Sequence, residues 1–239
     1  MMGKDFIARK SRYCLWLKDI LPSELKKYPK IMERVKNVRE FRLSCPSPDT
    51  NHYADKPTFP VRLRYYSEDR INPALALPKV SSQNRRYIPM EVIDADVIAG
   101  SKLFLIPDIS LYLFGVLTSN VHMAWMRTVC GRLKSDYSYA SNVVYNTFPW
   151  PEPTDQQRKK IEQTAQAILD ARALYPDSSL ADLYDELTMP PELRKAHRQN
   201  DMAVMQAYGF TKGSEAYKSE AACVAELMQR YQKLCEEQK

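Results

Sequence analysis

A chain of 239 residues with 44% apolar side chains can form two domains with a substantial core, which excludes a globally disordered protein. Its net charge of +6 is unevenly distributed. Residues 1–150 hold 23 Lys and Arg against 14 Asp and Glu, a net +9, and residues 151–239 hold 12 against 15, a net −3. A surface that binds a polyanion is therefore expected in the first part of the chain.

The sequence shows no signal-peptide pattern and no apolar run long enough to span a bilayer, so no membrane partner is expected. The five cysteines are scattered and form no Cys-x-x-Cys pair, which indicates reduced thiols and a cytoplasmic location. No histidine lies within four residues of a cysteine or of another histidine, a spacing that disfavours a zinc site.

The N-terminal residues predict one strand and two helices. The apolar run at 13–17 suits a buried strand, and Pro22 begins a short helix with Ser23 as its N-cap. A basic helix is expected over 29–45. Its apolar stripe consists of Ile31, Val35, Val38 and Phe41. We interpret its basic face as solvated, with phosphate contact as the alternative.

Residues 46–60 are rich in Pro, Asp and Asn and predict a loop. A basic polar loop at 81–87 lies among the short extended segments that follow, and one long helix is expected over 110–130. The extended segments are 62–66, 74–80, 87–93 and 102–106. This mixture of short strands and helices predicts an α+β fold for the first part.

Residues 131–151 read as one extended segment that ends in a Pro-aromatic-Pro sequence. Strand alternation would place two sets of side chains on opposite faces. One set is Leu133, Ser135, Tyr137 and Tyr139, and the other is Arg132, Lys134, Asp136 and Ser138. The polar set fits either a solvated face or a row of donors and acceptors that faces base pairs.

Beyond a Pro-rich hinge at 149–153 the sequence becomes acidic and helical. Four helices are expected at 154–175, 179–187, 190–208 and 214–237, with Gly209 ending the third. The predicted fold class is therefore α+β: a mixed short-strand and helix domain at 1–152, followed by an all-α helical domain at 153–239.

Motifs of catalysis are weak. Six glycines form no Gly-x-Gly, which argues against a dinucleotide, adenosylmethionine or P-loop site. Residues 146–150 lack the proline pair of an amino-methyltransferase motif. Asp19, Glu24 and Lys26 have the letters of a metal nuclease, but a helix start there would keep the carboxylates apart. We therefore expect that the chain alone is not an enzyme.

Long collinear motifs resemble one known family over nearly the whole chain. Gly131-Arg-Leu-Lys-Ser-Asp-Tyr-Ser-Tyr and Val144-Tyr-Asn-Thr-Phe-Pro-Trp-Pro are similar to the target recognition domain of MmeI-like enzymes, the type IIL single-chain restriction–methyltransferases. Leu183-Tyr-Asp-Glu-Leu-Thr-Met-Pro-Pro resembles the helical C-terminal domain of the same family.

The resemblance implies that this chain recognises a sequence in double-stranded DNA. It implies a parent that also contains a nuclease and an adenine-N6 methyltransferase, with S-adenosylmethionine and Mg²⁺ as cofactors of the parent. Those catalytic domains would lie upstream of residue 1 as partners of this portion, which itself would bind no cofactor.

The resemblance also implies base-reading positions, occupied here by Lys134 and Asp136. A Lys ammonium donates to guanine O6 and N7, and a carboxylate accepts from the cytosine N4 amine, so the pair suits one G·C pair. A second reading pair corresponds to Ser138 and Lys102. Phosphate contacts are expected from Arg85, Arg86, Arg127 and Arg132.

Apart from the resemblance, the residues leave other functions open. Lys134 and Asp136 also fit an exposed charge pair of little energetic consequence. An RNA-binding α+β protein would need an aromatic stacking platform on a sheet. A helical protein-interaction module with an incidental basic half is the other alternative.

Overall fold

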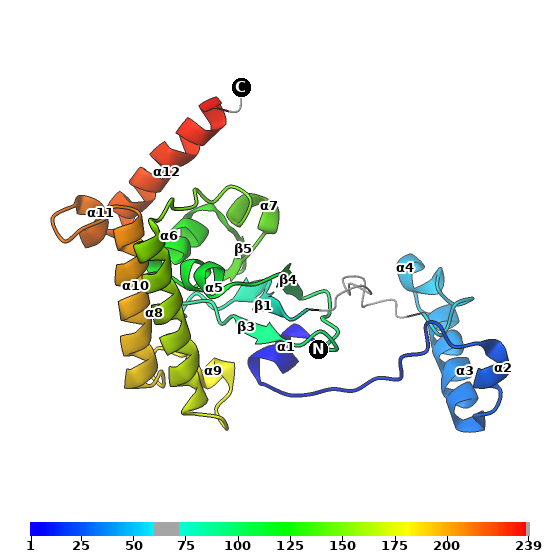
Figure 1. Ribbon diagram of the computed structural model, residues 1–239. Helices are drawn as coiled ribbons and strands as arrows, with labels where there is room; N and C mark the ends of the chain where they lie inside the picture. Colours follow the sequence, from blue (N-terminus) through cyan, green and yellow to red (C-terminus); the bar gives the residue numbers. More distant parts are fainter. Residues whose placement is uncertain (60–71, 238–239) are drawn as a thin grey trace.

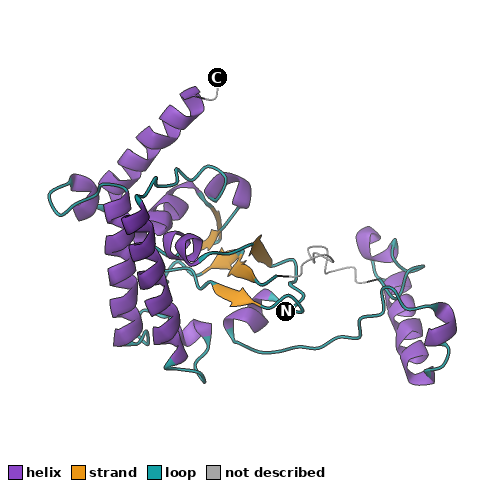
Figure 2. Ribbon diagram, viewed as in Figure 1, coloured by secondary structure: helices purple, strands orange, loops and turns teal. Residues whose placement is uncertain are grey.

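The structure is a computed structural model that describes residues 1–59 and 72–237. The expected extended segment at 62–66 lies outside these residues. Two small antiparallel sheets stand beside a layer of helices, consistent with the expected α+β fold followed by a helical part (Figure 2). No helix within the described ranges is long and apolar enough to cross a membrane.

The first sheet forms the centre of the α+β part and has the strand order β3-β1-β4. All five residues of the central strand are buried, because sheet neighbours and helices cover it. Its strands are β1 (Ala74–Pro78), β3 (Glu91–Ile93) and β4 (Leu103–Pro107). Segments predicted at 74–80 and 102–106 are thus strands, whereas only the last three residues of 87–93 are.

The second sheet has the order β2-β6-β5 and adjoins the first through Lys79. The Lys79 N–H donates to Lys102 O at 3.0 Å, and the Lys79 carbonyl accepts from the Tyr139 N–H at 2.8 Å. One residue between two strands therefore connects the sheets. The strands of the second sheet are β2 (Val80–Ser81), β5 (Gly131–Leu133) and β6 (Asp136–Ser138).

The helix predicted over 110–130 is two helices, α5 (Leu111–Leu117) and α6 (Asn120–Val129). Ser119 separates them, because its hydroxyl accepts from the His122 N–H at 3.3 Å and so caps a new helix. A short helix, α7 (Ser141–Val144), follows β6, so residues 131–151 are not extended throughout.

The C-terminal helices follow the sequence pattern closely. Thr154 and Gln157 form a capping box at the start of α8, as expected for a Thr N-cap. Gly209, with φ of 78°, ends α10. The expected last helix is divided by Ser219. These helices are α8 (Asp155–Ala173), α9 (Leu180–Leu183), α10 (Pro191–Ala207), α11 (Glu215–Lys218) and α12 (Glu220–Glu237).

Long helices α8 and α10 lie side by side and cover α5 (Figure 1). One continuous cluster of buried hydrophobic residues crosses from the α+β part into these helices. Its largest fully buried members include Trp125, Met90, Phe114, Ile161 and Ile168. The two parts of the chain therefore share a core.

The N-terminal helices are α1 (Gly3–Ile7), α2 (Pro22–Leu25), α3 (Pro29–Ser44) and α4 (Pro48–Asn51). Helices α2, α3 and α4 stand apart from the sheets and the C-terminal helices (Figure 1). Buried Arg42 joins α3 to the segment after α4, because its guanidinium donates to the carbonyls of Tyr53, Lys56 and Phe59 at 2.7–2.9 Å.

Three N-terminal predictions are wrong. The run at 13–17 is a loop with Tyr13 95% exposed, because none of the strands among the described residues pairs with it. Leu21 rather than Ser23 is the N-cap of α2, since the helix begins at Pro22 itself. The loop expected at 46–60 contains α4.

Candidate nucleic-acid interface

The segment that the sequence predicted as one strand is a β-hairpin. Strands β5 and β6 pair antiparallel, with Arg132 opposite Tyr137 and Leu133 opposite Asp136. Lys134 and Ser135 form the two-residue turn, and Lys134 has a left-handed φ of 57°. Lys134 and Asp136 therefore do not share a face of one strand. The turn has none of the Gly or Asn residues that usually mark such a hairpin, which is why the alternation was misleading.

The proposed reading residues on this hairpin differ in exposure and position. Lys134 is exposed at the turn. Asp136 is half-buried, and its Oδ1 accepts from the Gln83 backbone N–H at 3.4 Å. Ser138 lies at the far end of β6, between Val80 and Gly131 on the two neighbouring strands. The hairpin thus holds three of the four candidates.

Lys102, the fourth candidate, lies in the other sheet region. Its side chain is exposed just before β4, and its carbonyl accepts from Lys79. Lys79 in turn bonds to Tyr139, the residue after Ser138. The backbone therefore brings Lys102 and Ser138 to the same junction between the sheets.

Arg132 lies on the hairpin itself. Its guanidinium stacks over the Tyr137 ring at 3.9 Å from the centroid, and its Nη1 donates to Ser135 O at 3.0 Å. The residue as a whole is exposed. This arrangement fixes a cation against the outer surface of the hairpin.

Arg85 and Arg86 lie on the arginine loop, defined here as residues 82–86 between β2 and Tyr87. Arg85 is half-buried and Arg86 is exposed. The loop adjoins the hairpin through the Gln83–Asp136 contact. The structure therefore brings the loop arginines and the proposed readers to one region, although they are about fifty residues apart in the sequence.

Arg127 on α6 differs from the other arginines because its guanidinium is occupied by protein groups. Nε and Nη2 donate to the Glu220 carboxylate at 2.8 and 2.9 Å, and Nη1 donates to Arg86 O at 3.1 Å. Its side chain is only 20% exposed. The phosphate contact expected from the sequence would have to compete with these bonds. Nothing in the local sequence identifies Glu220 as its partner.

A cleft of about 550 Å³ separates the arginine loop from the C-terminal helices. Its lining includes residues 83–86 of the loop, Asn120 and Arg127 of α6, Glu186, and Ala216–Glu220. The acidic residues Glu186 and Glu220 therefore line the same cleft as Arg85 and Arg86.

Sequence reasoning missed a buried polar contact beneath this loop. The Tyr87 hydroxyl donates to Asp201 Oδ2 at 2.6 Å, and Asp201 Oδ1 accepts from the Asn120 N–H at 2.8 Å. Burial raises the pKa of Asp201 to about 6 and raises the pKa of Tyr87 above its ordinary value. Tyr87 and Asp201 are 114 residues apart, so no local pattern could reveal the pair.

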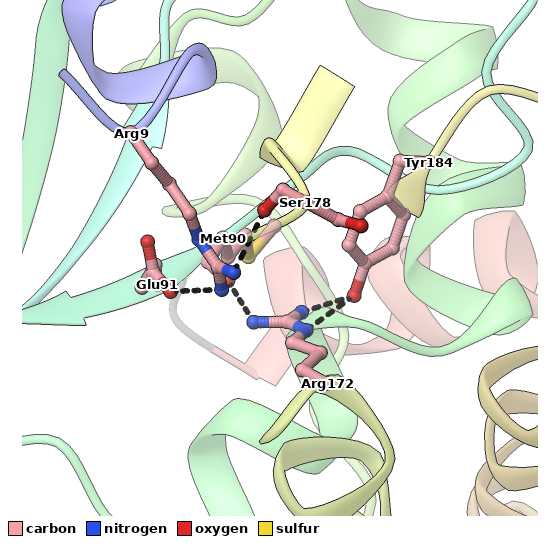
Figure 3. A network of polar contacts seen from close by, with 6 residues as sticks. All are labelled: Arg9, Met90, Glu91, Arg172, Ser178 and Tyr184. Carbon is pink, nitrogen blue, oxygen red and sulfur yellow. Dashed lines mark hydrogen bonds and ion pairs between the residues drawn. The ribbon is translucent and has the colours of Figure 1, made fainter. Parts of the chain in front are cut away.

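A second network, buried at Arg172 and Tyr184 and part-exposed at Arg9, joins the α+β part to the helices (Figure 3). Arg172 on α8 donates to Met90 O at 2.6 Å and to the Tyr184 hydroxyl. Arg9 donates to Glu91 Oε1 at 2.6 Å and to Ser178 O at 3.1 Å. These contacts fix the segment that follows Tyr87.

Both core histidines are buried and neutral. Burial lowers the pKa of His122 to about 3, and it holds the pKa of His197 well below the ordinary value. His122 contacts Phe148 edge-to-face, and His197 stacks on Tyr87. Both side chains therefore pack in the core. Within residues 1–59 and 72–237 no group of three His, Cys, Asp or Glu is arranged for a metal ion.

Comparison with known proteins assigns both parts of the chain. Residues 1–152 match the model of the MmeI target recognition domain, and residues 153–238 match that of the MmeI C-terminal domain. The chain belongs to the MmeI family. The predicted family resemblance is thereby confirmed, and residues 1–152 are a target recognition domain of the MmeI type.

Two longer proteins are similar to the chain over almost its whole length. DNA methyltransferase A of Bacillus subtilis (strain 168) is 36% identical over 97% of this chain and 25% of its own. The type IIL restriction-modification enzyme MmeI, solved in complex with DNA, is 43% identical with a TM-score of 0.88. That match covers 99% of this chain and 30% of MmeI. The chain thus spans about a quarter to a third of these relatives.

Proposed function

We propose that the chain recognises a specific sequence in double-stranded DNA. The match of residues 1–152 to the MmeI target recognition domain carries this proposal, and MmeI itself was solved with DNA. The excess of basic residues in the same part supports it. Division of the chain near residue 152 agrees with the two family matches, although the hydrophobic core is continuous across this point.

The hairpin suits the major groove. A two-stranded β-ribbon fits this groove. Here the turn end of the β5–β6 pair extends beyond the two residues of β2, and it would carry Lys134 toward the base edges. We assign Lys134 to guanine O6 and N7 and Asp136 to the N4 amine of the paired cytosine. Ser138 and Lys102 form the second reading pair. Each good contact discriminates against the wrong base by about 1–3 kcal/mol.

Phosphate contacts are assigned to arginines around the hairpin, of which Arg132 and Arg86 are exposed and Arg85 is half-buried. Arg132 lies on its outer surface, and Arg85 and Arg86 lie on the adjoining loop. Such contacts would orient the domain on the duplex without specifying sequence. A phosphate contact from Arg127 would require its guanidinium to give up its bonds to Glu220 and to the Arg86 carbonyl.

The chemistry of the whole enzyme would belong to other parts. Relatives of the chain are much longer, and one is a DNA methyltransferase. We propose that methyltransferase and nuclease domains act as partners of this portion, with S-adenosylmethionine and Mg²⁺ as their cofactors. Methylation of adenine N6 would require the target base to leave the stack.

The five free, scattered cysteines support a cytoplasmic location.

A salt titration of duplex binding tests the proposal. Fluorescence anisotropy with a labelled random-sequence duplex should show that affinity falls by about tenfold or more between roughly 50 and 200 mM salt, as released counterions require. An RNA hairpin of equal length serves as the comparison. Failure to bind any duplex at low salt, or stronger binding to RNA, would contradict the DNA function.

A further inference from the structure

We infer that the C-terminal helices hold the arginine loop (residues 82–86) in position for DNA through two contacts, Tyr87–Asp201 and Arg127–Glu220. The inference rests on the proposed DNA function and assigns a task to residues outside the recognition domain. Tyr87, Asp201, Arg127 and Glu220 are positioning residues for this loop, since the phosphate contacts they would support are those assigned to Arg85 and Arg86.

The first contact fastens the C-terminal end of the loop. Tyr87 is 2% exposed, its hydroxyl donates to Asp201 on α10, and its ring stacks on His197 at 4.1 Å between centroids. Asp201 also accepts from the Asn120 N–H, the first residue of α6, where a carboxylate is favourable. The buried Asp201 carboxylate therefore bonds both to the residue after the loop and to the start of α6, and so joins both to α10.

The second contact holds the loop backbone. Arg127 donates through Nη1 to the carbonyl of Arg86, the last residue of the loop, at 3.1 Å. Its other two nitrogens form a bidentate pair with Glu220, the first residue of α12. Such a pair fixes the plane of the guanidinium. Glu220 thus acts on the loop through Arg127.

The opposite end of the loop is attached to the proposed reading hairpin. Ser81 pairs with Tyr137 in β6, and the Gln83 N–H contacts the Asp136 carboxylate at 3.4 Å. Inside the loop, the Arg85 N–H donates to Ser82 O at 3.1 Å. The loop is therefore bonded to the hairpin at one end and, through Tyr87 and Arg127, to the C-terminal helices at the other. Both attachments determine where Arg85 and Arg86 lie.

Attachment before binding has a physical consequence. A loop that is already ordered loses less conformational entropy when it contacts DNA, so its arginines contribute more to affinity. Release of the loop should weaken binding and reduce the number of phosphates neutralised. The salt dependence of binding reports that number directly.

The test uses the full 239-residue chain and two conservative variants. Tyr87→Phe keeps the stacked ring and removes the hydroxyl, and Glu220→Gln keeps the shape of an exposed side chain and removes its charge. Each should lower duplex affinity by about three- to tenfold, within the range of coupling through such networks. Each should also reduce the slope of log affinity against log salt concentration by the amount that corresponds to roughly one phosphate contact.

Tyr175→Phe is the matched control. It removes another tyrosine–carboxylate bond, from the Tyr175 hydroxyl to Glu192 Oε2 at 2.7 Å, between the segment that follows α8 and the start of α10. This bond is exposed and does not involve the loop. Affinity and salt slope should remain those of the unaltered chain.

A double-mutant cycle separates positioning from general destabilisation. In a chain that carries Arg85→Ala and Arg86→Ala, Tyr87→Phe should have almost no further effect on affinity, because the groups it positions are gone. An equal loss in both backgrounds, or an unchanged salt slope in Tyr87→Phe and Glu220→Gln, would overturn the inference. If the unaltered chain bound no duplex, the proposed function itself would fail.

Discussion

Lys134 occupies a backbone conformation that a lysine rarely adopts. Its φ of 57° lies in the left-handed region, which costs a residue with a Cβ about 1–2 kcal/mol relative to glycine. A strained non-glycine residue at the tip of an exposed hairpin indicates that the side chain serves a purpose other than stability. Base reading is the purpose proposed above.

Lys134→Gly should therefore separate stability from recognition. The free energy of unfolding should stay equal or rise by up to about 1 kcal/mol, because glycine accepts this φ. Discrimination at one G·C pair should fall by about 1–3 kcal/mol. Denaturant unfolding and competition between duplexes that differ at single base pairs would measure the two effects.

Asp108→Gly is the control for this substitution. Asp108 also has a left-handed φ, of 51°, and its exposed side chain lies on the loop after β4. It should show the stability effect without the loss of discrimination. Preserved discrimination in Lys134→Gly would contradict the role of Lys134 as a reader.

Asp201 should make stability depend on pH. Its pKa is about 6 in the folded chain against an ordinary value of 3.8, because burial penalises the carboxylate more than Tyr87, the Asn120 N–H, Arg86 and Arg127 stabilise it. The folded state therefore binds the proton more tightly. The stabilisation is present at low pH and is lost as pH rises through about 6, with an upper limit of about 3 kcal/mol.

Asp201→Asn should remove this dependence. The amide is isosteric, its oxygen can accept from the Asn120 N–H, and its NH₂ can donate to the Tyr87 hydroxyl. Urea unfolding between about pH 4 and 7 should show a flatter profile for the variant. Identical profiles for the two proteins would show that Asp201 does not titrate in this range.

At the scale of elements, the close approach of α5 to α8 depends on Gly115. A Cβ at this position would lie 2.7 Å from Ile161 Cγ2 and 3.1 Å from Asn200 Oδ1. Asn200 on α10 donates through Nδ2 to the Gly115 carbonyl at 2.7 Å, so a buried hydrogen bond also joins α5 to α10. The glycine thus permits contact between helices of the two family-matched parts.

Gly115→Ala should destabilise the chain. Overpacking costs about 1–3 kcal/mol, which exceeds the gain of up to about 1 kcal/mol that alanine brings to a helix. We expect a net loss of about 1 kcal/mol in denaturant unfolding. Gly213→Ala is the control, since an added Cβ there meets no described atom within 4 Å. Equal stability of both variants would argue against tight packing at α5.

At the scale of the whole molecule, the chain contains two groups of elements that differ in how many buried residues hold them together. The main core unites the sheets with α5, α6, α8 and α10. The group formed by α2, α3 and α4 has few buried residues among those described, namely Leu25, Arg42 and Ala54. Exposed apolar side chains on this group include Met32, Val38, Phe41 and Leu43.

Hydrogen exchange should reveal this difference. Amides of α3 should exchange orders of magnitude faster than those of α8 and α10, because local opening of α3 disrupts little buried surface. The two family-matched parts should instead share their slowest exchange, since one core spans both. Equal protection of α3 and α8 would contradict this description.

Local patterns in the sequence determined most of the helical C-terminal part. Thr154 and Gln157 start α8, and Gly209 ends α10, because caps and helical periodicity involve residues within one or two turns. The charge asymmetry and the family motifs likewise lie in the sequence itself. They predicted the recognition domain, which the family matches confirm.

Only the tertiary structure decided how the proposed interface is assembled. The alternating sequence of residues 131–139 is compatible with one strand and with a hairpin, and the pairing of β5 with β6 places Lys134 at a turn. The Tyr87–Asp201 and Arg127–Glu220 contacts join residues 114 and 93 positions apart. Such pairs depend on the packing of the whole chain, so no local pattern specifies them.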